Sequence, residues 1–191
     1  MTNTSIIIVG AGQAGYQVAA SLRQEGFEGA ITLVGDEPGV PYQRPPLSKA
    51  YLLGKVGVEA LRFRPPEYFD EHRITRIQSS VSHIHRERRE LVLTSGETLT
   101  YDHLVLATGA RNRVPTVPGI ELNGVFGLRS LADADGLSQR LGRAQRAVVI
   151  GAGFIGLEFA AVAAARGISV DVLELGTRPM ARAVSTITSR V

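Results

Sequence analysis

The sequence contains no cysteine in its 191 residues. Disulfide bonds, thiolate metal sites, cysteine nucleophiles and redox-active dithiols are therefore excluded for this stretch of chain. Long apolar runs are also missing: those at residues 5–10 and 148–150 are strand-sized, whereas a bilayer crossing needs roughly 20 residues. We therefore expect no membrane-spanning segment and no membrane partner.

Charge of one sign is only slightly in excess. The chain carries 21 Lys and Arg against 18 Asp and Glu, a formal net charge of +3, and the basic residues are spread along it. So mild an excess does not indicate nucleic acid as a partner.

The content of 44% hydrophobic and 20% charged residues is ordinary for a folded protein with one sizeable domain or two small ones. Residues 1–5 lack the basic start of an export signal, so a cytoplasmic location is expected.

One pattern begins at residue 5. Residues 5–10 form the short apolar run that is typical of a parallel strand buried on both faces. Gly10-Ala-Gly12-Gln-Ala-Gly15 follows, then apolar residues at helical spacing up to position 25. A second apolar strand over residues 30–34 ends at Asp36. The order is strand, glycine-rich turn, helix, strand.

The same order recurs over residues 146–174, around Gly151-Ala-Gly153-Phe-Ile-Gly156 and ending at Glu174. Aligned backward from the second strand, residues 29–36 fall on residues 167–174 without a gap. The repeat predicts an α/β fold with two Rossmann-like dinucleotide-binding units. The second unit is expected to be incomplete, because such a unit normally has further parallel strands.

The elements predicted between the two copies are a short helix, several strands and a capped helix. In chain order they are a helix over residues 65–72, strands over 74–77, 81–85, 91–94, 98–101 and 104–108, and a helix capped by Ser130 that ends near residue 142. Residues 109–124 are rich in Pro and Gly, which indicates a crossing between domains.

The two glycine-rich turns have the spacing that a diphosphate requires. The first glycine permits the tight turn, the second lets backbone approach the ligand, and the third lets helix and strand pack closely. Asp36 and Glu174 are placed to accept hydrogen bonds from an adenosine ribose. A carboxylate there repels a 2′-phosphate, so Glu174 predicts NADH over NADPH, although the nearby Arg178 weighs the other way. Two dinucleotide sites in one chain suggest that a nicotinamide reduces a flavin.

Five motifs carry a more specific resemblance. They are Gly10-Ala-Gly-Gln-Ala-Gly15, Pro41-Tyr-Gln-Arg-Pro-Pro-Leu-Ser-Lys49, Leu106-Ala-Thr-Gly-Ala110, Leu128-Arg-Ser-Leu131 and Gly151-Ala-Gly-Phe-Ile-Gly-Leu-Glu158. With them the sequence resembles the FAD-dependent NADH:ferredoxin reductases of the putidaredoxin reductase and biphenyl dioxygenase reductase type. The resemblance covers nearly all of the chain, which corresponds to roughly the N-terminal half of such an enzyme.

The resemblance implies a glutathione-reductase-like pair of FAD- and NAD(P)-binding units. Residues 1–114 would be the N-terminal portion of the FAD-binding domain and residues 115–191 an incomplete NADH-binding domain, with the C-terminal interface domain absent. The whole enzyme would pass electrons from NADH through FAD to a [2Fe–2S] ferredoxin that serves a cytochrome P450 or a ring-hydroxylating oxygenase. The isolated segment is expected to bind FAD poorly and to be inactive.

The resemblance also implies which residues contact FAD. They are Gly10, Gly12, Ala14 and Gly15 at the diphosphate turn, Asp36 at the ribose, Val81 at the adenine through its backbone, Arg44 and Arg129 at the polar chain, and Thr108 and Gly109 close beside it. Lys49 would point at the N5 and O4 edge of the flavin, where a cation stabilises the reduced ring.

A second set of contacts is implied for NADH. Glu158 would pair with Lys49 and meet the nicotinamide carboxamide, and Phe154 would lie beside the nicotinamide pocket. The remaining contacts would come from Gly151, Gly153, Ile155, Gly156 and Glu174. Lys49 and Glu158 are thus the expected catalytic pair, and hydride transfer by stacking and alignment needs no general acid.

The missing cysteines discriminate among related two-dinucleotide enzymes. Disulfide reductases carry a dithiol near the position of residues 41–49 or shortly before the second fingerprint, and neither region holds a thiol here. Electrons would therefore leave the flavin directly. Two alternatives stay open: a rubredoxin reductase or nitrite reductase component, and a non-catalytic nucleotide-binding flavoprotein resembling apoptosis-inducing factor.

Two other clusters have ordinary explanations. His83 and His85 share a strand face at metal-ligand spacing, but no third ligand is evident, so no metal is predicted. Arg86, Arg88 and Arg89 are interpreted as the solvated face of a hairpin. A docking patch for an acidic ferredoxin there has no support in the sequence.

Overall fold

The computed structural model describes residues 4–190, except for the side chain of Arg190. The prediction that residues 1–5 are not an export signal falls partly on residues 1–3, which lie outside the described residues. The chain forms two compact units: Met1–Gln43 with Glu59–Ala110, and Arg44–Val58 with Arg111–Val191. The short segment Arg44–Val58 thus joins the later part of the chain. The assignment of residues 1–114 and 115–191 to two cofactor domains stays a prediction.

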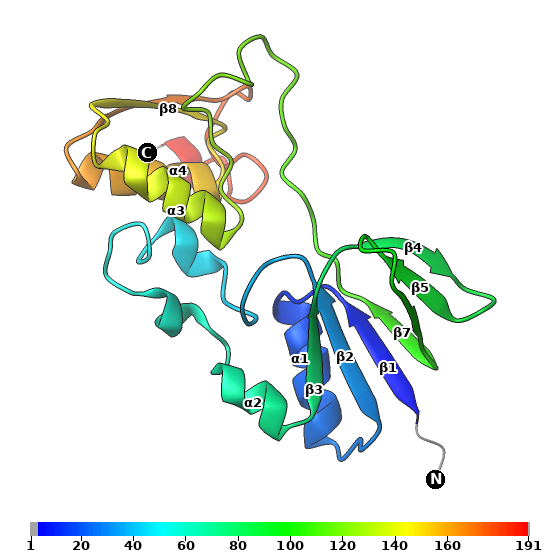
Figure 1. Cartoon of the computed structure of the whole chain (residues 1–191). Coiled ribbons are helices and arrows are strands. Elements are labelled where there is room, and N and C mark those ends of the chain that lie inside the picture. The colour runs from blue at the N-terminus through cyan, green and yellow to red at the C-terminus, as the bar shows by residue number, and fades with distance from the viewer. Residues whose placement is uncertain (1–3, 191) are drawn as a thin grey trace. The chain divides into compact units, whose positions relative to one another are not determined.

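A four-stranded parallel sheet is the centre of the first unit (Figure 1). Its strand order is β3 (Ile74–Gln78), β2 (Ala30–Gly35), β1 (Ser5–Val9) and β7 (His103–Leu106). In the central strand, Val9 pairs with Val34 on one side and with Leu106 on the other. The predicted strand, helix, strand order of the first copy is confirmed.

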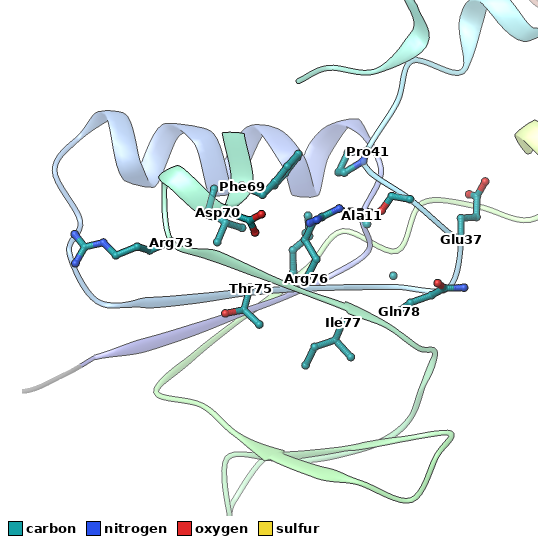
Figure 2. A pocket seen from close by; sticks show the side chains of 14 residues that line it. Ala11, Glu37, Pro41, Phe69, Asp70, Arg73, Thr75, Arg76, Ile77 and Gln78 are labelled. Atoms are coloured by element: carbon teal, nitrogen blue, oxygen red, sulfur yellow. Dashed lines mark hydrogen bonds between the residues drawn. The ribbon is translucent and has the colours of Figure 1, made fainter. Parts of the chain in front are cut away.

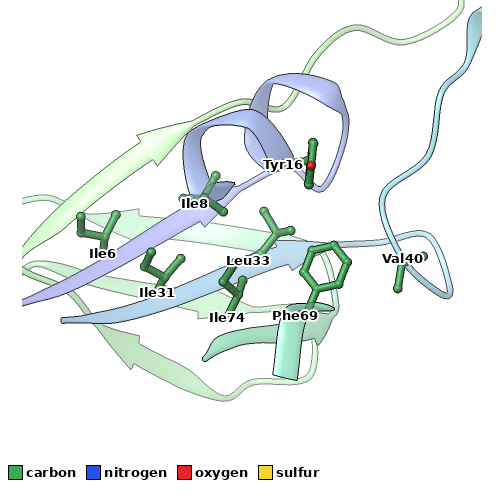
Figure 3. Packing of buried hydrophobic residues seen from close by; sticks show 9 residues of the cluster. Ile6, Ile8, Tyr16, Ile31, Leu33, Val40, Phe69 and Ile74 are labelled. Atoms are coloured by element: carbon green, nitrogen blue, oxygen red, sulfur yellow. The ribbon is translucent and has the colours of Figure 1, made fainter. Parts of the chain in front are cut away.

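Alternate residues of β1 face two different layers. Ile6 and Ile8 pack with Tyr16 of α1 (Gln13–Gln24) and Phe69 of α2 (Pro66–Glu71), the cluster drawn in Figure 3. Ile7 and Val9 face the opposite way, toward Leu91 and Leu93. Those two leucines belong to an antiparallel sheet of β4 (Val81–His85), β5 (Glu90–Leu93) and β6 (Thr98–Thr100). A strand covered on both faces explains the uninterrupted apolar run.

The second unit contains a parallel strand pair and two longer helices. Its elements are η1 (Pro45–Ser48), α3 (Leu131–Leu141), β8 (Arg146–Ile150), α4 (Phe154–Ala165), β9 (Ser169–Leu173) and η3 (Thr188–Arg190), and η2 (Val58–Leu61) lies where the chain returns to the first unit. The core joins Leu52 of the 44–58 segment to Leu137, Val162 and Ile168. Leu52 is fully buried, so burial of apolar surface fixes this segment on the second unit.

The start of α3 bears out the predicted cap. The Ser130 hydroxyl accepts a hydrogen bond from the Asp133 backbone N at 3.2 Å, and the Asp133 carboxylate accepts one from the Ser130 backbone N at 2.8 Å. This reciprocal pair satisfies N–H groups that have no partner inside the helix.

Among residues 4–190, none of the helices combines the length and apolar character that a bilayer crossing demands.

One face of the β8–β9 pair carries exposed apolar side chains. Val148 and Ile150 are 58% and 63% exposed, and Leu173 is 56% exposed. Parallel sheets are normally covered on both faces. The expectation of further parallel strands in this unit stays a prediction.

Candidate dinucleotide-binding sites

The two glycine-rich turns fold alike. Gly10 and Gly151 have φ angles of 112° and 103°, a left-handed backbone conformation that a side chain disfavours. Each donates its N–H to the adjacent second strand, Gly10 to the carbonyl of Val34 and Gly151 to the carbonyl of Leu173, both at 2.7 Å. The turn is therefore built the same way in both units.

The third glycine of each turn is required by close packing. A Cβ atom on Gly15 would lie 1.8 Å from the carbonyl oxygen of Gly10, and one on Gly156 would lie 2.2 Å from that of Gly151. Any larger residue would push the helix away from its strand. This contact confirms the packing role that the spacing predicts for the last glycine.

The middle glycine of each turn faces open space. Apart from the adjoining residues of the chain, no atom of the described residues lies within 4 Å of a Cβ built on Gly12 or on Gly153. Both residues have ordinary negative φ angles, −82° and −85°. Neither position therefore needs glycine for the fold of its unit. The absence of a side chain instead leaves room for a ligand to approach the backbone, as a dinucleotide diphosphate requires.

Both helices that follow have free positive ends. Within the part of the chain that the structure describes, no side chain caps α1 or α4, and neither helix has an acidic residue in its first turn. Their first N–H groups and helix dipoles are therefore available to an anion. Each unit thus fits the diphosphate of a dinucleotide, with Ala14 in the first turn of α1 and Ile155 in the first turn of α4.

Glu174 holds the second turn directly. Its Oε2 accepts a hydrogen bond from the Ala152 backbone N at 2.7 Å, and its Oε1 accepts one from the Gly176 backbone N at 2.8 Å. The bond from Gly176 and then that from Ala152 hold the pKa of Glu174 below its ordinary value. The carboxylate is therefore ionised beside the turn, where it would repel an added phosphate.

The gap-free alignment of Asp36 with Glu174 is wrong by one residue. Val34 and Leu173 occupy equivalent positions, since each accepts the hydrogen bond from the first glycine of its turn. Gly35 therefore corresponds to Glu174, and Asp36 falls one position further along. A Cβ on Gly35 would lie 2.5 Å from the Ala11 Cβ, so there is no room at this position for a side chain.

An open cavity of about 710 Å³ lies along the first unit at this place (Figure 2). Ala11 and Gly35 line it, together with Glu37, Arg76 and Gln78. The partly buried carboxylate of Glu37 accepts a hydrogen bond from the Tyr42 hydroxyl, whereas Asp36 is exposed. Sequence reasoning missed Glu37, because two consecutive acids follow the strand and only the fold shows which one lines the cavity. The ribose contact of Asp36 stays a prediction.

Two other predicted FAD contacts lie in the same unit. A Cβ on Gly10 would lie 2.1 Å from the carbonyl oxygen of Ala107 and 2.9 Å from the backbone N of Thr108, so the segment that leads into Thr108 and Gly109 lies beside the first turn. Val81 is the first residue of β4 and pairs with Leu93 before a break in register. Their contacts with a cofactor stay predictions.

Lys49 and Glu158 meet within the second unit. The Lys49 Nζ lies 2.9 Å from the Glu158 Oε1, and the side chains are 51% and 24% exposed. The Ser48 Oγ donates to the other oxygen, Oε2, at 2.5 Å. Burial alone would raise the pKa of Glu158, but the hydrogen bonds from Ser48 and Lys49 and the Lys49 charge together lower it. The expected pair is present, and Ser48 is a partner that sequence reasoning missed.

Four other residues predicted to contact a cofactor also belong to the second unit: Arg44, Arg129, Phe154 and Ile155. The Arg44 Nη1 donates to the carbonyl of Arg129 at 2.9 Å, and the Arg129 backbone N donates to Asp133 at 3.0 Å. Arg129 thus contributes through its backbone to the start of α3. Phe154 and Ile155, at the start of α4, are 57% and 55% exposed. An exposed aromatic ring beside a free helix end suits a flat ligand ring.

The histidine pair does not extend to a metal site in the described residues. The His83 and His85 rings lie 4.7 Å apart on β4. Within residues 4–190, no group of three or more His, Asp or Glu side chains is arranged to hold a metal ion.

Comparison with known proteins identifies the family. The family model described as pyridine nucleotide-disulphide oxidoreductase matches residues 4–191. This chain belongs to that family. It is a member without a thiol in these residues, since the sequence has no cysteine.

Relatives and solved structures give the same result. Rhodocoxin reductase of Rhodococcus erythropolis is 54% identical over 186 residues, which are 97% of this chain and 44% of the relative. The ferredoxin reductase of the CYP199A2 system from Rhodopseudomonas palustris has a TM-score of 0.95 at 51% identity, covering 98% of this chain and 46% of that one. The covalent putidaredoxin reductase–putidaredoxin complex has a TM-score of 0.94 at 40% identity, covering 100% of this chain and 46% of that one. The chain therefore spans less than half the length of these relatives.

Proposed function

We propose that the whole protein containing these residues passes electrons from NADH through FAD to a [2Fe–2S] ferredoxin, which in turn serves a cytochrome P450 or a ring-hydroxylating oxygenase. The observation that carries the proposal is the 2.9 Å contact between Lys49 and Glu158. It joins the Pro-Pro-Leu-Ser-Lys motif to the helix of the second glycine-rich turn. The similarity to rhodocoxin reductase and to the ferredoxin reductase of a P450 system supports the choice of acceptor.

FAD is assigned to the first turn and NADH to the second. Support comes from the open space at Gly12 and Gly153 and from the free N–H groups of α1 and α4, which together accept a diphosphate in each unit. When both cofactors are bound, the nicotinamide supplies a hydride and the flavin passes the two electrons on singly. The protein's contribution is to bind, orient and supply charge.

Lys49 supplies a fixed positive charge for the flavin edge. A cation placed in advance stabilises charge that develops in the reaction more than a mobile one does, because no reorganisation is needed. Glu158 fixes that cation through its Oε1. Its ionised carboxylate would also accept a hydrogen bond from the nicotinamide carboxamide. These residues neither give up nor take a proton in the proposed transfer.

NADH is preferred over NADPH because of Glu174. The carboxylate is held beside the second turn by the backbone N–H groups of Ala152 and Gly176. A 2′-phosphate at the adenosine ribose would place like charges close together. Arg178, the candidate phosphate partner, instead donates to the carbonyls of Val184 and Ala181 at 2.9 Å. The cytoplasmic location stays a prediction.

The proposal is tested by adding NADH anaerobically to the FAD-loaded whole protein and then supplying an acceptor. The flavin absorption is expected to bleach on mixing and to recover when a [2Fe–2S] ferredoxin is added. Failure to bleach would contradict the use of NADH. Recovery with rubredoxin but not with ferredoxin would replace the proposed acceptor by the alternative one. A long-lived reduced complex that neither acceptor oxidises would favour the non-catalytic alternative.

A further inference from the structure

Ser48 is a buried polar residue with a defined partner. It is 5% exposed, and among the residues whose burial is described it is, tyrosines aside, the only buried one with a polar or charged side chain. It closes the 3-10 helix η1 and precedes Lys49 directly. A buried hydroxyl costs free energy unless it is hydrogen-bonded, so its partner decides what the residue does.

That partner is the carboxylate of Glu158. The Ser48 Oγ lies 2.5 Å from the Glu158 Oε2 and 3.5 Å from the carbonyl oxygen of Pro45. A hydroxyl has one proton to donate, and the short contact to an ionised acceptor is much the stronger of the two. The proton of Ser48 is therefore directed at Glu158.

The two oxygens of Glu158 thus have separate partners. Oε1 contacts Lys49 and Oε2 contacts Ser48, and these are consecutive residues of one short segment. A glutamate has three rotatable side-chain bonds, so one ion pair alone leaves its orientation free. Two anchors on adjacent residues fix both the position and the rotation of the carboxylate.

We propose that Ser48 is a positioning residue, which orients the Glu158 carboxylate toward Lys49. The effect of Ser48 on electron transfer rests on the proposed function, whereas its effect on the Glu158 carboxylate is independent of that function. The bond from Ser48 is the foremost of the contributions that lower the pKa of Glu158, and these outweigh the raising effect of burial. Removing the hydroxyl therefore favours the neutral acid.

Within the described part of the chain, Ser48 and Lys49 are the side chains that bond to the Glu158 carboxylate. Glu158 is the only charged residue on α4 itself. On the neighbouring strands, Arg146 of β8 and Asp171 of β9 are paired with each other, with 3.3 Å between Nη2 and Oδ2. From the 44–58 segment, Lys49 faces the carboxylate.

The rival explanation is that Ser48 only fills the core beside η1. A core role would change the stability of the protein but would not act through Glu158. Three variants of the whole, FAD-loaded protein separate the two: Ser48→Ala, Ser48→Cys, and Tyr51→Phe as the matched control. Tyr51 belongs to the same segment, and its hydroxyl lies 2.5 Å from the Asp135 Oδ1 instead of on Glu158. Cysteine keeps the shape of serine but is a weak donor.

The first readout is the titration of the Glu158 carboxyl carbon, followed by NMR of protein labelled with ¹³C-glutamate. The midpoint is expected to lie at higher pH in Ser48→Cys than in wild type, to lie higher still in Ser48→Ala, and to stay in place in Tyr51→Phe. An unchanged midpoint in Ser48→Ala, or in Ser48→Cys should the alanine variant not fold, would overturn the proposal. This readout requires no turnover, so it holds even where reduction by NADH fails.

The second readout is the rate of anaerobic flavin reduction by NADH. Ser48→Ala is expected to slow it about tenfold, the size of a lost hydrogen bond to a charged group. In a Glu158→Gln background the same change is expected to have no further effect, because the residue acts through the carboxylate. An equal slowing in both backgrounds would show a purely structural role and overturn the proposal.

Discussion

The Lys49 Nζ lies 2.9 Å from the Glu158 Oε1, although the two residues belong to motifs more than a hundred positions apart. Lys49→Met is expected to slow flavin reduction by NADH about a hundredfold, because the positive charge that we propose for the flavin edge is lost. Glu158→Gln, which keeps the shape of the side chain, is expected to cost about tenfold. Stopped-flow absorbance measures both rates.

Lys55→Met is the matched control for that experiment, because Lys55 is the only other lysine and is exposed. It is expected to leave the rate unchanged. The Lys49 and Glu158 variants should also combine to less than the product of their separate effects, since the residues are in contact. Full additivity would contradict a shared role.

Glu174 is expected to set the choice between NADH and NADPH. Glu174→Gln removes the negative charge and keeps an acceptor oxygen for the Ala152 N–H, so binding of NADPH should improve relative to NADH by about tenfold. The ratio of kcat/KM for the two nucleotides measures the change. Asp171→Asn on β9, the strand that Glu174 follows, is the control. An unchanged ratio in Glu174→Gln would exclude Glu174 as the discriminating residue.

Asp102 is expected to make the stability of the first unit dependent on acid. Its Oδ2 accepts hydrogen bonds from the Ser5 backbone N at 2.7 Å and from the Ser5 hydroxyl at 3.0 Å, and the backbone bond is the largest cause of its lowered pKa. A lowered folded-state pKa adds stability above the ordinary pKa of about 3.9, which is lost as the pH falls through the folded-state value.

Urea unfolding of wild type and Asp102→Asn at pH 7 and pH 3 checks this dependence. The variant should be the less stable protein at pH 7, and the difference should shrink at pH 3. Glu97→Gln, a change at an exposed residue of the hairpin, should show neither effect. A difference that persists unchanged at pH 3 would mean that the ionised carboxylate of Asp102 is not what stabilises this contact.

Gly15→Ala is expected to destabilise the protein because of crowding alone. The new Cβ would lie 1.8 Å from the carbonyl oxygen of Gly10, a backbone atom that cannot move aside cheaply. We expect a loss of about 2 kcal/mol or more in the free energy of unfolding. Gly12→Ala, where the Cβ meets open space, should cost at most about 1 kcal/mol. Equal losses in denaturant unfolding would contradict the packing role of the third glycine.

Much of the fold follows from local chemistry in the sequence. The apolar run over β1, the glycine turns and the Ser130 cap each depend on neighbouring residues, and the structure confirms them. The correspondence of Glu174 with Gly35, and not with Asp36, was not predictable in this way. The connection between the helix and the second strand is residues 25–29 in the first copy and residues 166–168 in the second. It is therefore two residues shorter in the second copy, and a repeated pattern alone does not locate the two missing residues.

The role of Ser48 was also beyond local reasoning. In the sequence it is one small polar residue in a motif, and its burial depends on α4, which follows far along the chain. The position of Leu52 in the core of the second unit depends on the same long-range packing. Burial and pairing across such separations are properties of the tertiary structure, and composition or spacing does not contain them.

The assignment of one dinucleotide to each turn is tested most directly by a pair of matched substitutions, Gly12→Val and Gly153→Val, in the whole protein. Both glycines have ordinary φ angles and open space at the Cβ position, so each valine blocks the ligand approach and not the fold. The bound FAD and the rate of reduction by NADH are measured in both variants. We predict that Gly12→Val loses FAD, whereas Gly153→Val keeps FAD and is no longer reduced by NADH. A Gly153→Val protein that retains normal reduction by NADH, or a Gly12→Val protein with its full content of FAD, would contradict the assignment.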